Sequence, residues 1–238
     1  MTNAEKQVIL DRVKIWFNES IAKQHIINTE KLKNAKEFNI NPFLAVYLAN
    51  FLSGTSQARD IAKALILPRV LGTSITTSFG TQMQRFTNDV LSAFGSTTAG
   101  IDIEFIDQLD GRKKYCQLKA GPNTINKDDV ETIAGHFNGV IKLARTNNQS
   151  LAFDQMIVGV IYGCDADLSS HYKRITSQYH YPVIVGNDFW KCLTGDDNFY
   201  HDMIDAIGEV AIEANFTERL NEIIDELARN PEISKLAR

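Results

Sequence analysis

Cysteine is scarce in this sequence: only Cys116, Cys164 and Cys192 occur among 238 residues. They are odd in number and far apart, and none belongs to a CxxC pair. Disulfide-stapled domains need several paired cysteines, and structural zinc sites need cysteine or histidine ligands at short spacings. We therefore expect three reduced thiols and exclude both a disulfide framework and a structural zinc site.

Long apolar runs are also missing. A membrane-spanning helix needs about 20 consecutive apolar residues, and no stretch of this chain approaches that length. The opening residues, Met-Thr-Asn-Ala-Glu-Lys, lack the basic and then apolar layout of a signal peptide. We expect a protein of the cytoplasm with no membrane partner.

Several catalytic signatures are absent. The chain has no GxSxG, GxGxxG or GxxxxGK[ST] motif, which counts against a serine hydrolase, a dinucleotide-binding protein and a P-loop ATPase. The formal net charge of −4 counts mildly against nucleic-acid binding, because phosphate contacts need positive charge. A basic cleft would nevertheless be enough for a nuclease.

The most informative stretch spans residues 101–126. Apolar and polar side chains alternate over residues 101–106 and 114–120. The dipeptide Asp110-Gly111 between these runs tolerates the positive φ angles of a tight turn. The pattern predicts two adjacent antiparallel strands joined by a hairpin turn.

Polar residues gather on one face of each predicted strand, since successive side chains point to opposite faces. Asp102 and Glu104 share a face of the first strand, and Gln117 and Lys119 share a face of the second. If the two faces coincide, two carboxylates, an amide and an ammonium converge at one end of a small sheet. Such a group would suit a hard divalent cation with a lysine beside it.

The order of Asp102, a hairpin and then Gln117-Leu118-Lys119 resembles the PD-(D/E)xK nuclease superfamily. The longer run Gln-Leu-Lys-Ala-Gly-Pro-Asn-Thr-Ile-Asn over residues 117–126 is similar to type II restriction endonucleases whose motif reads QxKxGP. The resemblance is closest over residues 68–147, and elsewhere it extends only to the order of elements. It implies an α/β fold in which helices flank a mixed central β-sheet.

The resemblance also implies a magnesium-dependent site that hydrolyses phosphodiesters. Asp102 would be the fixed anionic ligand of Mg²⁺, and the Gln117 side chain and the Leu118 backbone carbonyl would supply two further oxygens. Lys119 would orient the attacking water and stabilise negative charge on the scissile phosphate.

Gln117 departs from the carboxylate that is commoner in this motif. An amide carries no charge, so it binds Mg²⁺ less strongly than a carboxylate does. Glu104 could restore the missing charge as a catalytic neighbour. Alternatively, Glu104 is an exposed strand residue and Gln117 a natural member of the QxK branch, and the sequence leaves both interpretations open.

Candidate DNA contacts follow the motif. A helix is predicted over residues 127–145, and the free N–H groups at its start suit a phosphate. We expect Asn123, Thr124, Asn126 and Lys127 to contact DNA, although Asn126 can instead cap this helix. Residues 69–78 are rich in serine and threonine and include Arg69, so they predict a helix entry, a clamp on the DNA backbone, or both.

The remaining chain predicts helices around short buried strands. Residues 156–162 and 182–185 form apolar strands that complete the sheet, and residues 171–181 suit either nucleic-acid contact or a surface loop. Scaffold helices are expected from residue 56 to just before Pro68 and over residues 79–94. We expect a single domain, 1–238, with a helical N-terminal part (1–67), a catalytic core (68–186) and a helical C-terminal part (187–238).

The resemblance as a whole implies a type II restriction endonuclease. Such an enzyme would act as a homodimer on double-stranded DNA, at a palindromic site of the GGNCC sort, alongside a cognate DNA methyltransferase. Two other classes stay open: a non-catalytic DNA-binding protein on the same fold, and a structural or assembly protein whose hairpin is merely part of a sheet.

Overall fold

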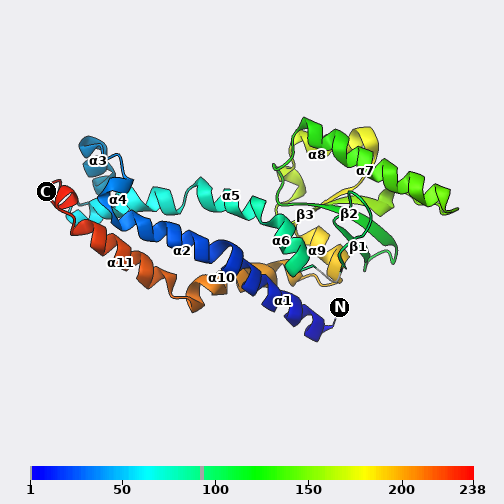
Figure 1. The fold of residues 1–238 in the computed structure, drawn as a ribbon, viewed down its shortest axis with the longest axis horizontal. Coiled ribbons are helices and arrows are strands. Elements are labelled where there is room, and N and C mark those ends of the chain that lie inside the picture. Colours follow the sequence, from blue (N-terminus) through cyan, green and yellow to red (C-terminus); the bar gives the residue numbers. More distant parts are fainter. Residues whose placement is uncertain (1, 92–93) are drawn as a thin grey trace. The chain divides into compact units, whose positions relative to one another are not determined.

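The computed structural model describes residues 2–91 and 94–238 (Figure 1). The chain forms two compact units, the first made of Met1–Trp16 and Gly80–Ala206 and the second of Phe17–Phe79 and Ile207–Arg238. The first unit contains every strand that the structure describes. Each unit therefore combines two segments that are distant in the sequence.

The first unit is built on a four-stranded sheet. Its strands are β1 (Ile103–Ile106), β2 (Lys113–Lys119), β3 (Met156–Val160) and β4 (Val183–Val185), in the order β1-β2-β3-β4. β1 and β2 are antiparallel, whereas β2, β3 and β4 run parallel. The predicted mixed sheet with flanking helices is confirmed.

Two helices cover one face of this sheet (Figure 1). α7 (Lys127–Thr146) connects β2 to β3, and α8 (Ser170–Tyr179) connects β3 to β4. Their apolar side chains join those of the strands in one core, which includes Val130, Ile133, Phe137, Val158, Val160, Tyr172 and Ile175. The surface-loop interpretation of residues 171–181 is wrong, because Tyr172 and Ile175 recur at helical spacing and are buried.

Aromatic rings cover the opposite face. α9 (Asn187–Thr194) packs Phe189 so closely on β3 that a Cβ added at Gly159 would lie 2.4 Å from its ring. Phe189 also contacts Phe105 and Trp190, and Trp190 contacts Phe86 of α6 (Met83–Asp89). Among the described residues this unit also contains α1 (Asn3–Phe17), the first part of α10 (Phe199–Glu213) and 3₁₀ turns at Phe153–Gln155 and Asp165–Asp167.

The connection between β1 and β2 is longer than the tight turn that the sequence predicts. β1 ends at Ile106 and β2 begins at Lys113, so residues 107–112 form a loop. Only Gly111 within it has a positive φ, 70°. The tight-turn prediction is wrong because Asp107 and Arg112 pair through a backbone hydrogen bond of 3.0 Å and leave a wider loop between them.

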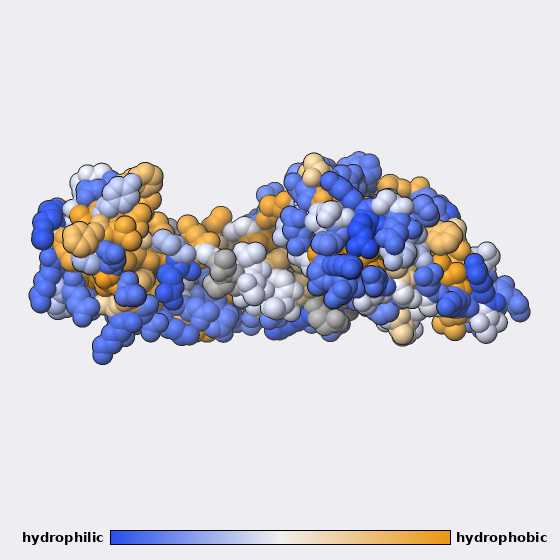
Figure 2. All heavy atoms as spheres, turned by 90° about the horizontal axis from the view of Figure 1, so that it is seen from above, coloured by the Kyte–Doolittle hydropathy of each residue, from blue (hydrophilic) through white to orange (hydrophobic). Residues whose placement is uncertain are grey.

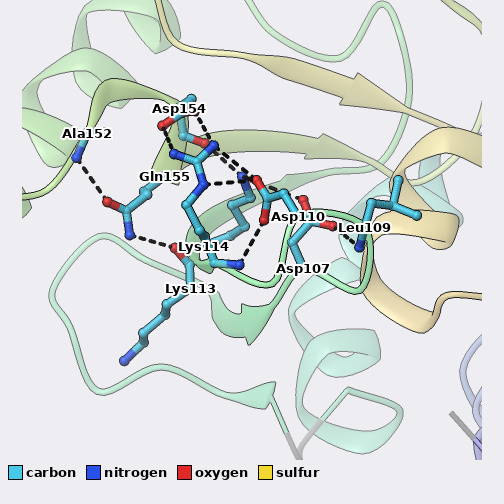
Figure 3. A network of polar contacts seen from close by, with 9 residues as sticks. Asp107, Leu109, Asp110, Lys113, Lys114, Ala152, Asp154 and Gln155 are labelled. Atoms are coloured by element: carbon cyan, nitrogen blue, oxygen red, sulfur yellow. Dashed lines mark hydrogen bonds and ion pairs between the residues drawn. The ribbon is translucent and has the colours of Figure 1, made fainter.

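Charged side chains hold this loop in place (Figure 3). Lys114 and Asp107 are both buried, and the Lys114 ammonium lies 2.5 Å from Asp110 and 3.5 Å from Asp107. Arg112 pairs with both Asp110 and Asp154. Hydrogen bonds from Lys114 and from the Arg112 backbone N–H lower the pKa of Asp110 to about 2. The loop is therefore fastened by ion pairs as well as by its backbone.

The second unit is helical, and its core joins the N-terminal segment to the C-terminal one. Buried residues of this core include Leu32, Ala49, Ile61, Ile66, Ile223 and Leu227. Its helices are α2 (Lys23–Glu30), α3 (Pro42–Ser53), α4 (Ala58–Val70), α5 (Thr73–Thr81), α11 (Phe216–Ala228) and α12 (Pro231–Ser234), with a π-helical turn at Asn18–Ala22 and 3₁₀ turns at Lys31–Lys33 and Ala35–Glu37.

Two predicted helix boundaries are wrong. α4 continues through Pro68, because Ile66 and Val70 are buried and their packing holds the last turn. The single helix expected over residues 79–94 is two helices, α5 and α6, and residues 92–93 lie outside the described part. Much of the hydroxyl-rich segment is itself helical, as α5, since serine and threonine cost no more than about 0.7 kcal/mol each in a helix.

Candidate active site

A pocket of about 230 Å³ lies where the end of β2 meets the first half of α7. Three of the four side chains predicted to be catalytic, Asp102, Gln117 and Lys119, line it together, and Glu104 does not. The full lining is Gly100, Ile101, Asp102, Gln117, Lys119, Asp129, Thr132, Ile133 and His136.

Strand pairing explains why these side chains meet. The register of the hairpin pairs Ile103 with Cys116, and Asp102 donates its backbone N–H to the Cys116 carbonyl at 3.0 Å. Residues opposite each other in an antiparallel pair have side chains on the same face, so Asp102 and Gln117 point to one side. Lys119, two residues further along β2, points to that side as well.

Asp102 is partly buried, and its Oδ2 accepts a hydrogen bond from the Leu118 N–H at 2.7 Å. Burial raises the pKa of Asp102, and the Leu118 N–H and the charge of Lys119 offset only part of that rise. Its other oxygen, Oδ1, has no hydrogen bond to any residue that the structure describes. A cation at Oδ1 would favour the ionised form, which burial disfavours.

Gln117 is only 5% exposed, and its amide is held at the pocket wall. Its Nε2 lies 2.6 Å from Nδ1 of His136 and also donates to the Gly100 carbonyl. Both contacts use the nitrogen of the amide, so the oxygen Oε1 is the atom that these contacts leave to a ligand.

The Leu118 carbonyl is directed toward β1. Backbone carbonyls alternate in direction along a strand, and the Lys119 carbonyl accepts the Ile161 N–H from the β3 side at 3.0 Å. The Leu118 carbonyl therefore points away from β3, to the side on which the Cys116 carbonyl accepts the Asp102 N–H. The resemblance assigns a third oxygen ligand to this atom.

Lys119 brings positive charge to the pocket. Its side chain is partly buried, and its ammonium forms no hydrogen bond or ion pair with residues 2–91 or 94–238. An ammonium carries three donor N–H groups. These donors stay available to a ligand that enters the pocket.

One wall of the pocket comes from α7 and is missed by reasoning from the sequence. Asp129, Thr132, Ile133 and His136 follow at spacings of three and four residues, so they share a helix face. The sequence shows this helix and assigns Asp129 to its cap. No local pattern indicates, however, which polar residues of the helix reach the hairpin.

Glu104 belongs to a separate cluster on the hairpin. Its carboxylate accepts hydrogen bonds from the hydroxyls of Ser96 at 2.5 Å and Thr98 at 2.7 Å, and it pairs with Lys113 at 2.6 Å. Burial raises the pKa of Glu104, but these three partners outweigh it and hold the pKa below its usual value. Glu104 is thus neither an exposed strand residue nor a pocket residue, and it ties the segment before β1 to the hairpin.

Two of the residues expected to contact DNA make hydrogen bonds within the protein. Asn126 Oδ1 caps α7 by accepting the backbone N–H groups of Asp128 at 2.8 Å and Asp129 at 3.1 Å. Thr124 donates its hydroxyl to the Gly121 carbonyl at 2.8 Å. These bonds shape the loop that leads from β2 into α7.

The other three residues expected to contact DNA lie in two different parts of the chain. Asn123 and Lys127 are exposed next to the start of α7. Arg69 lies in the second unit, where its guanidinium donates to the Glu37 carbonyl at 3.3 Å and lies 6.0 Å from the Phe38 ring centroid.

The oxygen donors at the pocket fit a hard divalent cation. Mg²⁺ prefers oxygen ligands and usually takes only one or two carboxylates from a protein. No group of three or more His, Cys, Asp or Glu side chains in the described ranges could hold a metal ion. At this pocket Asp102 offers a carboxylate oxygen and Gln117 an amide oxygen.

The chain matches the family model of the type II restriction endonuclease EcoO109I over residues 6–215. A comparison with curated proteins finds no match. None of the helices that the structure describes has the length and apolar character needed to cross a membrane. The matched range contains the whole sheet, the pocket and most of the helices. The chain belongs to the EcoO109I family of type II restriction endonucleases.

Proposed function

We propose that the protein is a magnesium-dependent endonuclease of the PD-(D/E)xK superfamily that cuts both strands of double-stranded DNA at a specific site. One observation carries the proposal: Asp102, Gln117 and Lys119 line a single pocket in a chain of a restriction endonuclease family. The motif order and the geometry agree, because the hairpin register puts all three side chains on one face.

In this proposal three oxygens of the hairpin hold Mg²⁺: Asp102 Oδ1, Gln117 Oε1 and the Leu118 carbonyl. The bound cation would polarise the phosphoryl oxygen and offset charge that develops in the transition state. Lys119 orients the attacking water and donates hydrogen bonds to the oxygens of the scissile phosphate. Its donors are free for this because no residue of the described chain engages them.

Asp129 compensates for the neutral amide of Gln117. An amide ligand leaves the site one negative charge short of a site with two carboxylates. Asp129 is the second carboxylate that lines the pocket, whereas both oxygens of Glu104 are bound elsewhere. Asp129, and not Glu104, would therefore supply the second negative charge of the site.

We expect Glu104→Gln to leave the magnesium dependence of cleavage unchanged, because Glu104 does not line the pocket. Loss of the ion pair with Lys113 should lower the free energy of unfolding by no more than about 1 kcal/mol. The test is the cleavage rate as a function of Mg²⁺ concentration, together with urea unfolding. A shift of the Mg²⁺ midpoint would place Glu104 in the metal site.

DNA contacts are proposed next to the start of α7. Lys127 and Asn123 are exposed there and would contact phosphates or bases, and Asn126 would contribute through its Nδ2 group, since its Oδ1 caps the helix. Thr124 would position the loop through Gly121. Arg69, which belongs to the second unit, would contact the DNA backbone.

We also propose that two copies of the chain act together, since each copy holds one such pocket and two strands must be cut. α3 buries its small residues, Ala45 and Ala49, and exposes its large ones. The exposed fractions are 85% for Phe43, 56% for Leu44, 62% for Tyr47, 38% for Leu48, 73% for Phe51 and 48% for Leu52. Figure 2 shows apolar side chains gathered over the part of the second unit that contains α3.

A second copy is the occupant that best fits this α3 face. A two-fold interface places the same patch on both partners, so the patch must be compatible with itself. α3 contains no Asp, Glu, Lys or Arg, and a pair of such faces meets without repulsion between like charges. Exposed apolar patches of this kind usually mark protein contacts.

Replacing both Phe43 and Phe51 with glutamate should convert the dimer to a monomer at micromolar concentration. Introduced carboxylates would face each other across the two-fold axis and would lose their hydration there. Sedimentation or light scattering would measure the mass, and Leu143→Glu, which changes an exposed leucine on α7, is the control. A wild-type chain that sediments as a monomer would contradict the proposal.

The recognition site is proposed by family membership to be an interrupted, GC-rich palindrome of the GGNCC sort. A cognate DNA methyltransferase would protect the same site in the same cytoplasm. Digestion of a sequenced genome with the purified protein and Mg²⁺, followed by sequencing of the fragment ends, tests activity, site and stagger together. Specific binding without any cleavage would favour a non-catalytic DNA-binding protein, and absence of both would favour a structural role.

A further inference from the structure

The side-chain amide of Gln117 is held by two groups at once. Its Nε2 lies 2.6 Å from Nδ1 of His136, and the same nitrogen contacts the backbone carbonyl of Gly100. Gly100 lies just before β1, and His136 lies on α7. Two segments that flank the hairpin thus converge on one amide group.

The Gly100 carbonyl decides which way the amide is turned. A carbonyl only accepts hydrogen bonds, so the atom of Gln117 against it must be the nitrogen. The reverse orientation would place the amide oxygen against another oxygen. Because the Gln117 Nε2 is the donor, His136 accepts this hydrogen bond at Nδ1.

We propose that His136, together with the Gly100 carbonyl, is a positioning group that turns the Gln117 amide so that Oε1 is presented to the divalent cation. The inference rests on the proposed metal site. Both N–H groups of the amide are used by these two acceptors, which leaves only the oxygen for the pocket.

The need for such a group follows from the chemistry of an amide. A carboxylate offers an acceptor oxygen at both ends, so a rotation by 180° changes nothing. A glutamine turned the wrong way presents N–H donors to the cation, which repel it. A chain with glutamine at this ligand position therefore gains from acceptors that fix one orientation, as outer partners do for other metal ligands.

The backbone at Gly100 is shaped to bring these partners together. Its φ is +77°, in the region that L side chains rarely adopt, and an added Cβ would lie 2.4 Å from the His136 ring. The imidazole thus packs directly against the glycine whose carbonyl binds the same amide. Gly100 is needed both for its conformation and for the space it leaves.

The test uses Mn²⁺ titrated into the full chain without DNA, followed by calorimetry. His136→Ala should weaken Mn²⁺ binding by about 10-fold, the usual size of such outer-partner effects. His136→Asn should recover most of the loss, because an asparagine oxygen can take the place of Nδ1 as the acceptor. His201→Ala removes an exposed histidine elsewhere in the first unit and should change nothing.

A second pair of variants tests whether His136 acts through Gln117. Adding His136→Ala to a Gln117→Ala chain should cause no further loss of Mn²⁺ affinity, because the group that His136 positions is already gone. An equal loss in both backgrounds would overturn the proposal, as would unchanged affinity in His136→Ala or no Mn²⁺ binding by the wild-type chain.

The readout is independent of cleavage. A wild-type protein that binds Mn²⁺ with this pattern but cuts no DNA would contradict the proposed function and leave the positioning role intact. If the wild-type protein cleaves DNA normally but His136→Ala binds Mn²⁺ as tightly as the wild type, the positioning role is wrong and the proposed function stands. Thermal unfolding of each variant shows whether a loss of affinity comes from unfolding instead.

Discussion

Lys119→Ala should lower the rate of DNA cleavage by about 10²- to 10³-fold, the effect of removing one preorganised donor that stabilises transition-state charge. Sequence-specific DNA binding and folding should be largely unchanged. The ammonium of Lys119 lies in the pocket that Asp102 and Gln117 also line. Its removal takes away charge stabilisation and water orientation at the phosphate but no hydrogen bond or ion pair with the described residues.

Lys127→Ala is the matched comparison, since this lysine is exposed at the start of α7. Loss of a phosphate contact should weaken binding to all DNA sequences alike. It should also reduce the slope of the logarithm of affinity against the logarithm of salt concentration by about 1. Single-turnover cleavage at saturating enzyme and affinity at several salt concentrations distinguish the two lysines. Retained cleavage by Lys119→Ala would show that the catalytic assignment is wrong.

Lys114→Met should lower the free energy of unfolding of the first unit by about 3–5 kcal/mol, the usual cost of removing one partner from a buried ion pair. The Lys114 and Asp107 side chains are only 5% and 6% exposed. Without the ammonium, Asp107 keeps a buried negative charge whose hydrogen bond from the Leu109 N–H at 2.9 Å does not neutralise it. The substitution therefore affects the hairpin that carries the pocket.

Tryptophan fluorescence reports this unfolding selectively, because both tryptophans, Trp16 and Trp190, lie in the first unit. Lys113→Met is the control: its ammonium sits on the other side of the strand (Figure 3), with a side chain 46% exposed. It should cost no more than about 1 kcal/mol. Combining Lys114→Met with Asp107→Leu should recover much of the loss, and an additive loss would contradict the buried-charge explanation.

The hairpin shows what a local sequence pattern can and cannot predict. Alternation along residues 101–106 and 114–120 predicts both strands and the shared face of Asp102, Gln117 and Lys119, because the side-chain period of a strand is a local property. The same pattern does not predict the loop between the strands. Its length depends on where Lys114 and Asp107 become buried, and that burial comes from the rest of the unit.

Glu104 and His136 show the opposite case. Glu104 lies on the same face as Asp102 by alternation, yet Ser96, Thr98 and Lys113 draw its carboxylate away from the pocket. His136 belongs to a helix whose amphipathic pattern is plain, yet its role depends on a contact with Gln117, 19 positions earlier in the chain. Neither outcome follows from spacing, because each depends on partners outside the element.

The sequence by itself determined the motif, the strands that carry it and the mixed sheet, since these follow from periods of two and of three to four residues within short segments. Tertiary structure alone decided that α7 supplies Asp129 and His136 to the pocket, and that residues 17–79 and 207–238 share one core. Such contacts join segments far apart in the chain. Their free energy comes from burial and from hydrogen bonds that form only once the segments have packed.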